Sequence, residues 1–260
     1  MTAVALTIAG SDPSGGAGIQ ADLKTFQRFG VYGEAVITLL TIQNTRALSA
    51  VHPLDPELVT KQIRAVIEDI PPAAAKTGAL GDAAIIEAVA GLAASFQFPL
   101  VVDPVMVSKH GARLLAPDAE TALRSKLLPR AFLIMPNLPE AEALTGHTIH
   151  TKEDMQAAAQ RLYDLGCPNV LIKGGHLPGQ PVDLLFGNQG GRFLEGTRIK
   201  TRHTHGTGCA YSAAITAGLA LGRSLEESVS QAKEFVQRAI ETAPGLGAGN
   251  GPLNFNISAR

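Results

Sequence analysis

The sequence lacks tryptophan, contains only two cysteines and has only 5% aromatic residues. Cys167 and Cys209 are too few and too poorly spaced to form a metal knuckle or a disulfide scaffold. No charge of one sign dominates, because 22 Lys and Arg residues stand against 23 Asp and Glu residues, a formal net charge of -1. Since the basic residues are scattered rather than clustered, we expect no nucleic-acid partner and no anionic-membrane surface.

Long hydrophobic runs are also missing. No apolar stretch reaches the length that crosses a bilayer. The apolar stretch near the N-terminus is interrupted by Ser11, Asp12 and Pro13, which come too early for a signal peptide. We therefore expect a cytoplasmic protein without a membrane partner.

What is present fits an ordinary globular protein. A chain of 260 residues with 45% hydrophobic residues can bury a substantial core. It contains no linker, repeat or charge block, so we predict a single domain over residues 1–260. Short continuous apolar runs alternate with helical patterns, which predicts an α/β fold: a three-layer αβα arrangement, with helices on both faces of a mostly parallel central sheet.

The predicted elements follow from hydrophobic periodicity and from turn residues. Strands are predicted at 4–9, 35–42, 73–77, 100–103, 131–135 and 169–173, with a hairpin of 184–186 and 192–195 around 188–191. Helices are predicted at 19–29, 55–70, 82–96, 152–165, 206–221 and 224–243.

Polar side chains follow five of these strands, where each strand ends. Ligands of open parallel sheets bind beyond the carboxyl ends of the strands. Several polar residues on one edge therefore indicate an active site there, whereas one alone would be unremarkable. These residues are Asp12, Gln43, Asn44, Asp103, Asn137, Glu140 and Lys173.

The segment 203–210 (HTHGTGCA) leads directly into an Ala-rich helical pattern. Gly206, Thr207 and Gly208 therefore lie at a predicted helix N-terminus, where unpaired N–H groups and the helix dipole bind a phosphate. Cys209 falls in the first turn, where the same dipole favours a thiolate. The alternative is a flexible glycine turn that simply precedes a helix.

Standard nucleotide motifs do not account for this segment. Gly10 and Gly15 have the spacing of a P-loop, but Gly16 and Ala17 stand where Lys and Ser/Thr are required. The segment 206–211 lacks the third glycine of a dinucleotide fingerprint, which disfavours a hydride-transfer enzyme.

Phosphoryl transfer accounts for more of the polar residues. It needs a cation for phosphate, a divalent metal and a positioned hydroxyl. Lys173 can supply the cation to ATP phosphate together with Thr207 and Gly208, while Asp103 and Glu140 can hold Mg²⁺ through water. Taken singly, Lys173 can be a solvated lysine, Asp103 a strand-end turn and Glu140 a helix-start residue. Together they favour one site.

Seven motifs, in order through nearly the whole chain, resemble the bacterial hydroxymethylpyrimidine/phosphomethylpyrimidine kinases of thiamine biosynthesis, members of the ribokinase-like superfamily. They are 9–26 (AGSDPSGGAGIQADLKTF), 36–38 (VIT), 43–45 (QNT), 103–106 (DPVM), 136–140 (PNLPE), 171–176 (LIKGGH) and 204–209 (THGTGC). The resemblance implies ATP-dependent phosphorylation of 4-amino-5-hydroxymethyl-2-methylpyrimidine, then of its monophosphate to the diphosphate. It also implies Mg²⁺ and a homodimer.

The substrate residues follow from the same resemblance and from side-chain chemistry. The Gln43 amide can pair with a ring nitrogen and its neighbouring amino group. Asp22 and the backbone near Gly10 are implied to lie close to the substrate, although Asp22 can equally be a solvent-facing helix carboxylate. Cys209 is implied to accept the hydroxymethyl proton. The helix dipole lowers the pKa of its thiol and nearby phosphates raise it.

Two stretches depart from the family pattern. Ala79 stands where the family often has Met, which predicts a smaller side chain at the pyrimidine pocket. Residues 108–112 (SKHGA) differ from the usual pattern after the Asp103 motif.

Three rival functions stay open. The first is a pyridoxine or pyridoxal kinase of the same superfamily, the second a cysteine hydrolase using Cys209 with His205 as base, and the third a non-catalytic pyrimidine-binding protein. We expect His203 and His205 to support the glycine loop and Cys167 to be structural. For 245–251 the sequence allows either a closing segment or a mobile tail.

Overall fold

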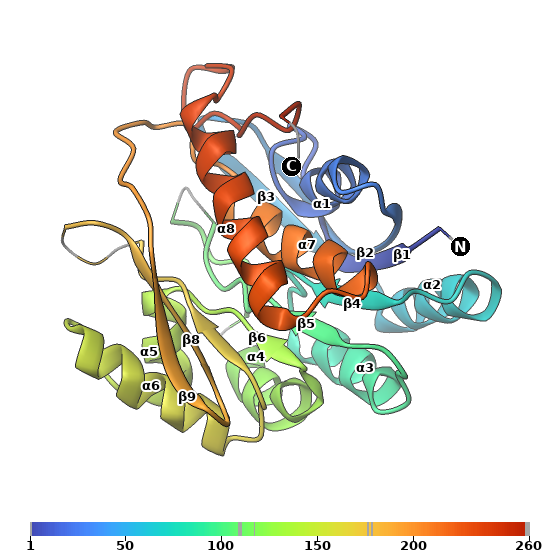
Figure 1. The fold of residues 1–260 in the computed structure, drawn as a ribbon. Coiled ribbons are helices and arrows are strands. Elements are labelled where there is room, and N and C mark those ends of the chain that lie inside the picture. Colours follow the sequence, from blue (N-terminus) through green and yellow to red (C-terminus); the bar gives the residue numbers. More distant parts are fainter. Residues whose placement is uncertain (1, 109–110, 117, 176, 178, 258–260) are drawn as a thin grey trace.

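The computed structural model describes residues 2–108, 111–116, 118–175, 177 and 179–257. Its strands form one nine-stranded sheet in the order β3-β2-β1-β4-β5-β6-β7-β8-β9 (Figure 1). From β2 to β7 neighbouring strands are parallel, while β3, β8 and β9 each run antiparallel to the preceding strand of the chain. The prediction of a mostly parallel α/β sheet is confirmed. The strands are β1 (Val4–Ser11), β2 (Tyr32–Gln43), β3 (Leu48–Pro53), β4 (Ala74–Thr77), β5 (Leu100–Val102), β6 (Leu133–Ile134), β7 (Val170–Ile172), β8 (Val182–Gly187) and β9 (Gly190–Glu195).

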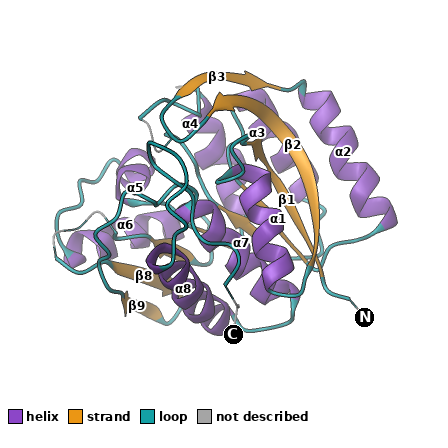
Figure 2. Ribbon diagram, turned by 90° about the horizontal axis from the view of Figure 1, so that it is seen from above, coloured by secondary structure: helices purple, strands orange, loops and turns teal. Residues whose placement is uncertain are grey.

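Helices cover both faces of the sheet. One buried cluster packs α1, α7 and α8 on one face, and the other packs α2 to α6 on the opposite face. Figure 1 and Figure 2 show α7 and α8 side by side, with α1 next to α7. The helices are α1 (Gly18–Arg28), α2 (Pro56–Asp69), α3 (Ala83–Ala93), α4 (Ala119–Ala122), α5 (Leu138–Thr145), α6 (Lys152–Asp164), α7 (Thr207–Ala220) and α8 (Leu225–Glu241). A π-helical turn (Leu123–Leu127) and a 3₁₀ turn (Leu128–Arg130) follow α4.

The chain changes direction within the sheet between β1 and β4. From β1 it moves outward to β2 and β3, and it then returns to β4 on the other side of β1. Neighbouring parallel strands whose connections diverge in this way leave a crevice at their carboxyl ends, where ligands of α/β proteins bind. The predicted polar edge lies on that side of the sheet.

Strand β3 and the short helices α4 and α5 were not predicted. β2 runs beyond its last pairing with β1, at Leu40, and its end pairs with β3 to form a hairpin. Much of β3 is exposed, so it lacks the continuous apolar run that marks a strand buried within a parallel sheet. α5 begins with a capping box between Asn137 and Glu140, a signal that the sequence did carry.

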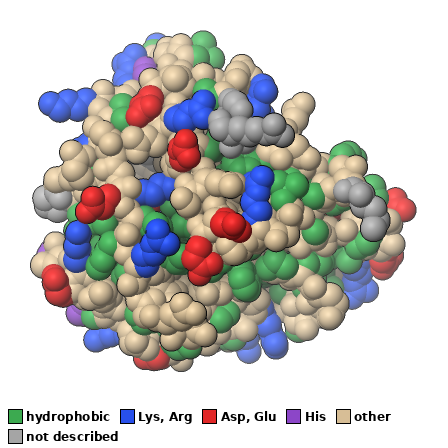
Figure 3. Space-filling model, viewed as in Figure 1, with side chains coloured by type: hydrophobic (Ala, Val, Ile, Leu, Met, Phe, Trp, Pro, Cys, Tyr) green, Lys and Arg blue, Asp and Glu red, His purple; other side chains and the backbone are tan. Residues whose placement is uncertain are grey.

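The surface agrees with the charge balance of the sequence. On the face shown in Figure 3, Lys and Arg side chains are interspersed with Asp and Glu side chains. Within the part of the chain that the structure describes, no helix combines the length and apolar character needed to span a bilayer.

Candidate active site

Three of the predicted strand-end residues meet in one cluster. Lys173 follows β7 and Asp103 follows β5, and Lys173 Nζ lies 2.7 Å from Asp103 Oδ1. The same Nζ lies 3.9 Å from Glu140 Oε2, in the first turn of α5. The Lys173 side chain is only 15% exposed. Lys173 is therefore not the solvated lysine that its sequence position alone allows.

The charges of this cluster are set by burial and by mutual attraction. Burial lowers the pKa of Lys173, but Asp103 and Glu140 outweigh it and hold that pKa above its usual value. Burial raises the pKa of Glu140 to about 7, and Lys173 counters only part of this effect. Glu140 also accepts a hydrogen bond from the Asn137 backbone N–H, so it caps α5 as well as facing Lys173.

The donor set of the cluster suits a hard cation. Asp103 and Glu140 offer carboxylate oxygens, which Mg²⁺ prefers, and it binds through few carboxylates while keeping several waters. Among the described residues, no group of three or more His, Cys, Asp or Glu is arranged to hold a metal. The candidate metal ligands are therefore these two carboxylates.

The start of α7 lies directly beside this cluster. A Cβ atom added to Gly208 would lie 3.4 Å from Asp103 Oδ2 and 3.6 Å from Lys173 Nζ. Any longer side chain would fill that space. The glycine therefore leaves room at a helix N-terminus next to a lysine, which are the features of a phosphate site.

Gly206 and Thr207 shape the turn that enters α7. Gly206 has a φ of 81°, and a Cβ atom there would collide with the carbonyl oxygen of Gly16. Only glycine fits this left-handed position so close to another backbone. The Thr207 hydroxyl donates to the Thr204 carbonyl at 2.8 Å, so it braces the turn. The segment is thus a fixed turn, not a flexible one.

A second lysine–aspartate pair lies deeper in the protein. Lys76 Nζ of β4 donates to Asp22 Oδ1 of α1 at 2.8 Å, and both side chains are 0% exposed. Thr7 Oγ1 of β1 donates to Asp22 Oδ2 at 2.6 Å. Asp22 is therefore not a solvent-facing helix carboxylate. Sequence reasoning missed Lys76, although the residue opens the motif in which Ala79 departs from the family pattern.

Cys209 lies in the first turn of α7 and is partly exposed. Burial raises the pKa of its thiol to about 12, Lys76 lowers it, and Asp22 and Asp103 raise it. Burial therefore opposes the thiolate that the helix dipole favours, and a pKa of about 12 corresponds to a protonated thiol at neutral pH.

Gly10 and Gln43, two further predicted substrate residues, lie in β1 and at the end of β2. Gly10 packs tightly, because a Cβ atom there would meet Leu39 Cδ1 at 2.5 Å. Gln43 ends β2 in the projecting hairpin and is partly exposed. Neighbouring Asn44 uses its side chain to accept from the Arg46 and Ala47 backbone and so shapes the hairpin turn.

The structure also shows the surroundings of Cys167 and of Ala79, and it describes part of the stretch 108–112. Cys167 is buried and its thiol donates to the Asn169 carbonyl at 3.1 Å, so its structural role is confirmed. The Ala79 carbonyl accepts from the Thr38 hydroxyl at 2.6 Å. In the departing stretch 108–112, Lys109 and His110 lie outside the described residues, as does His176 of the Lys173 motif.

Comparison with known proteins identifies the family. Residues 12–254 match the family described as phosphomethylpyrimidine kinase. The chain belongs to this family. The hydroxymethylpyrimidine/phosphomethylpyrimidine kinase of Bacillus subtilis is 48% identical over 255 residues, which cover 96% of this chain and 93% of that protein.

Solved structures agree with this assignment. A phosphomethylpyrimidine kinase from Clostridium difficile matches with a TM-score of 0.82 and 45% identity over 92% of this chain and 100% of that one. The ADP complex of Bacillus subtilis pyridoxal kinase matches with a TM-score of 0.89 and 40% identity, covering 97% of each chain. Family membership implies use of ATP and supports a kinase rather than a cysteine hydrolase.

Proposed function

We propose that this chain transfers the γ-phosphoryl group of ATP to 4-amino-5-hydroxymethyl-2-methylpyrimidine, and then phosphorylates the monophosphate to the diphosphate, in thiamine biosynthesis. The observation that carries the proposal is the Asp103–Lys173–Glu140 cluster placed against Gly208, at the start of α7, in a chain of this family. A cationic side chain, two carboxylates and a helix N-terminus are what phosphoryl transfer needs in one place.

The phosphate side of the proposed site has two parts. Lys173 binds an ATP phosphate as a point charge, and the backbone N–H groups of Gly206 and Gly208 are donors to the transferred group. Thr207 holds the turn in place, since its N–H donates to the Thr204 carbonyl at 3.3 Å. Asp103 and Glu140 would hold Mg²⁺, and the ion would neutralise phosphate charge when bound.

The substrate side is built from Gln43, Gly10 and Asp22. The Gln43 amide pairs with the aminopyrimidine edge, and the chain near Gly10 approaches the ring closely. Asp22 is 0% exposed and both of its carboxylate oxygens already accept hydrogen bonds, so we place it as a support beneath the substrate rather than a direct contact. Cys209 lies beside the hydroxymethyl group. With its pKa at about 12, the thiol acts as a donor that orients this hydroxyl.

The test is an ADP-release assay with Mg-ATP and four acceptors: the hydroxymethylpyrimidine, its monophosphate, pyridoxal and pyridoxine. We expect turnover of both pyrimidines, with the mono- and diphosphate identified by mass, and weak turnover of the two vitamers. A preference for pyridoxal would change the assigned substrate but leave the proposed phosphoryl-transfer mechanism unchanged. No ADP from any acceptor, with K173M as the blank, would overturn the proposal.

Three further proposals accompany this function. We propose that the chain forms one domain, that it works as a homodimer and that it acts in the cytoplasm. Light scattering on the purified protein measures its mass in solution and so tests the homodimer. A monomer at the concentration used in the assay would contradict that proposal.

A further inference from the structure

His205 occupies a junction just before the start of α7. Its ring Nε2 lies 2.8 Å from Asp12 Oδ2, and the two side chains are 6% and 1% exposed. Its backbone N–H donates to the Gly251 carbonyl at 3.1 Å. The ring also packs on Gly16, since a Cβ atom there would meet His205 Cδ2 at 2.6 Å. One residue therefore touches two segments that are distant in the sequence.

Asp12 accepts hydrogen bonds from several residues of the loop between β1 and α1. Its carboxylate accepts from the Ser14 N–H at 2.8 Å, from the Ser14 hydroxyl at 3.0 Å and from the Ala17 N–H at 2.8 Å. Burial raises its pKa, but the hydrogen bonds from His205 and Ser14 outweigh burial and lower the pKa to about 2. Asp12 is therefore a carboxylate that depends on several donors at once.

The segment 245–256 forms the third part of this junction. Pro252 pairs with His205 in an isolated bridge, and the Asn250 N–H donates to the Thr45 carbonyl at 2.7 Å. His205 is thereby linked to the turn of the β2–β3 hairpin. The tail 245–251 is thus attached to the hairpin turn through Asn250, while residues 245–248 are exposed.

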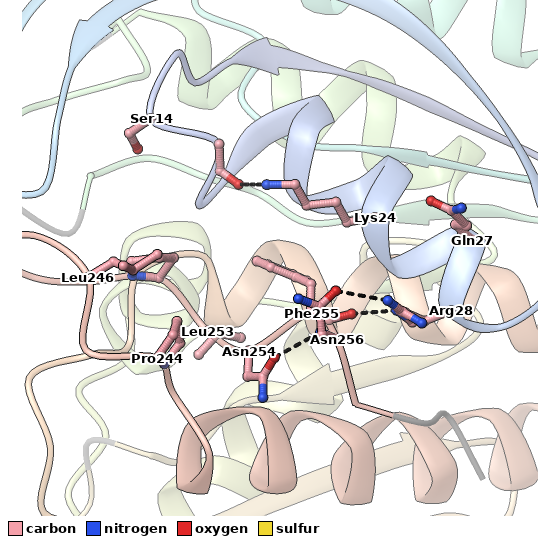
Figure 4. A pocket seen from close by; sticks show the side chains of 12 residues that line it. Ser14, Lys24, Gln27, Arg28, Pro244, Leu246, Leu253, Asn254, Phe255 and Asn256 are labelled. Carbon is pink, nitrogen blue, oxygen red and sulfur yellow. Dashed lines mark hydrogen bonds between the residues drawn. The ribbon is translucent and has the colours of Figure 1, made fainter.

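The far end of the same segment is fastened to α1. Figure 4 shows Arg28 beside Phe255 and Asn256, where Arg28 Nε donates to the Phe255 carbonyl at 2.7 Å. Lys24 turns back to the loop and donates to the Gly15 carbonyl at 2.6 Å. A cavity of about 310 Å³ lies between these elements. The segment is held at both ends, with His205 at the end nearest the active site.

We infer that His205 is a positioning residue for phosphoryl transfer: through Asp12 and the 250–252 backbone it holds the Gly206–Cys209 turn in register with the loop 12–17 between β1 and α1. The inference rests on the proposed kinase function. Its physical reason is that transfer needs the phosphate N–H groups and the attacking hydroxyl within a fraction of an ångström of their working positions. A displacement of about 1 Å costs about 100-fold in rate.

The test compares His205→Leu with His205→Gln. Leucine fills space but cannot donate to Asp12, whereas the glutamine Nε2 can replace the imidazole Nε2. The matched control is His147→Gln, because His147 also faces an aspartate, Asp154 at 3.8 Å, but in a pair that is 28% and 31% exposed at the start of α6. We expect His205→Leu to lower kcat about 100-fold with both KM values within about threefold of wild type, since ligand contacts remain. We expect glutamine to restore most of the rate and the control to behave as wild type.

Two results would overturn the inference. One is a large rise in the KM for ATP with kcat unchanged, which would make His205 a phosphate contact. The other is an equal loss of kcat in the leucine and glutamine variants, with thermal unfolding showing that both variants are folded. That result would make the hydrogen bond to Asp12 irrelevant.

If the wild-type chain phosphorylates none of the four acceptors, the proposed function fails, and the inference is tested by alkylation of Cys209 with iodoacetamide. Release of the turn in His205→Leu should change the alkylation rate of Cys209, resolved from Cys167 by peptide mass, at least tenfold. An unchanged rate would overturn the positioning role independently of kinase activity.

Discussion

Two lysine–aspartate pairs flank the start of α7, and they differ in what surrounds them. Lys76 and Asp22 are both 0% exposed and lie 2.8 Å apart. Lys173 and Asp103 lie 2.7 Å apart, but Lys173 is 15% exposed and has Glu140 as a second carboxylate at 3.9 Å. The first pair is sealed and balanced one to one. The second is at the rim, with more carboxylates than cations.

This difference separates a charged pair that supports stability from a charged pair that can bind ligands. A sealed pair is costly to desolvate, and removing one partner leaves an uncompensated buried charge, so its chief effect falls on stability. A rim pair can exchange partners, because Lys173 can turn to a phosphate while Asp103 and Glu140 take a cation. In the proposed function Lys173 therefore serves the reaction directly, whereas Lys76 holds Asp22 in place.

The largest expected effect comes from breaking the rim pair. Lys173→Met removes the phosphate cation, and we expect kcat to fall about 1,000-fold while the protein stays folded, because the group stabilises charge that develops in the transition state. Steady-state kinetics beside circular dichroism measures this. Lys173→Arg keeps the charge but not the geometry and should lose less. A folded methionine variant that keeps more than a tenth of wild-type kcat would contradict the direct role of Lys173 in the reaction.

Breaking the sealed pair should act on stability. Lys76→Met leaves the Asp22 carboxylate buried without a cation, and we expect the free energy of unfolding to fall by about 3 kcal/mol in urea titrations. The double variant Lys76→Met/Asp22→Asn should recover most of that loss, because a neutral amide can still accept from Thr7. If the double variant is no more stable than the single one, the pair is not the cause.

This contrast also shows what the sequence could predict. The parallel sheet, most element bounds and the rim residues followed from local signals, since apolar runs and strand-end polar residues lie close together in the chain. Lys76 and Asp22 are separated by 54 residues. Their pairing depends on α1 packing on β1, the strand next to β4 in the sheet, and no local pattern encodes that arrangement. The same holds for His205 and Asp12, which the sequence placed in two separate motifs.

Cys209, between the two pairs, sharpens the comparison. Because burial raises the pKa of its thiol to about 12, we expect it to be protonated at pH 7 and to orient the hydroxyl rather than accept its proton. Cys209→Ala should then lower kcat less than about 100-fold, below the range typical of a lost general base. The measurement is kcat between pH 6.5 and 9. A loss near 10,000-fold, or a wild-type limb near pH 8 that the variant lacks, would make the thiol a base.

A buried carboxyl without a lysine gives the smallest and most specific test. Glu34 in β2 is 8% exposed, and its Oε2 has no hydrogen-bond partner among the described residues. Burial, and then the like charge of Asp69, raises its pKa from 4.5 to about 7. Asp22 and Asp103 are each held by a cation, whereas Glu34 is stabilised by taking up a proton.

The sign of the pH dependence follows from that raised pKa. The native state binds the Glu34 proton more tightly than the unfolded chain, so its contribution to stability is complete below pH 4.5 and is lost as the pH rises to about 7. Glu34→Gln mimics the protonated form, and we expect it to exceed wild type by about 2 kcal/mol at pH 8 and to match it near pH 4.5, with kcat unchanged. Urea titrations of both proteins across this range measure the difference, in which the other carboxyls cancel. Parallel stability curves would show that Glu34 finds a partner in solution and that its burial carries no pH-dependent cost.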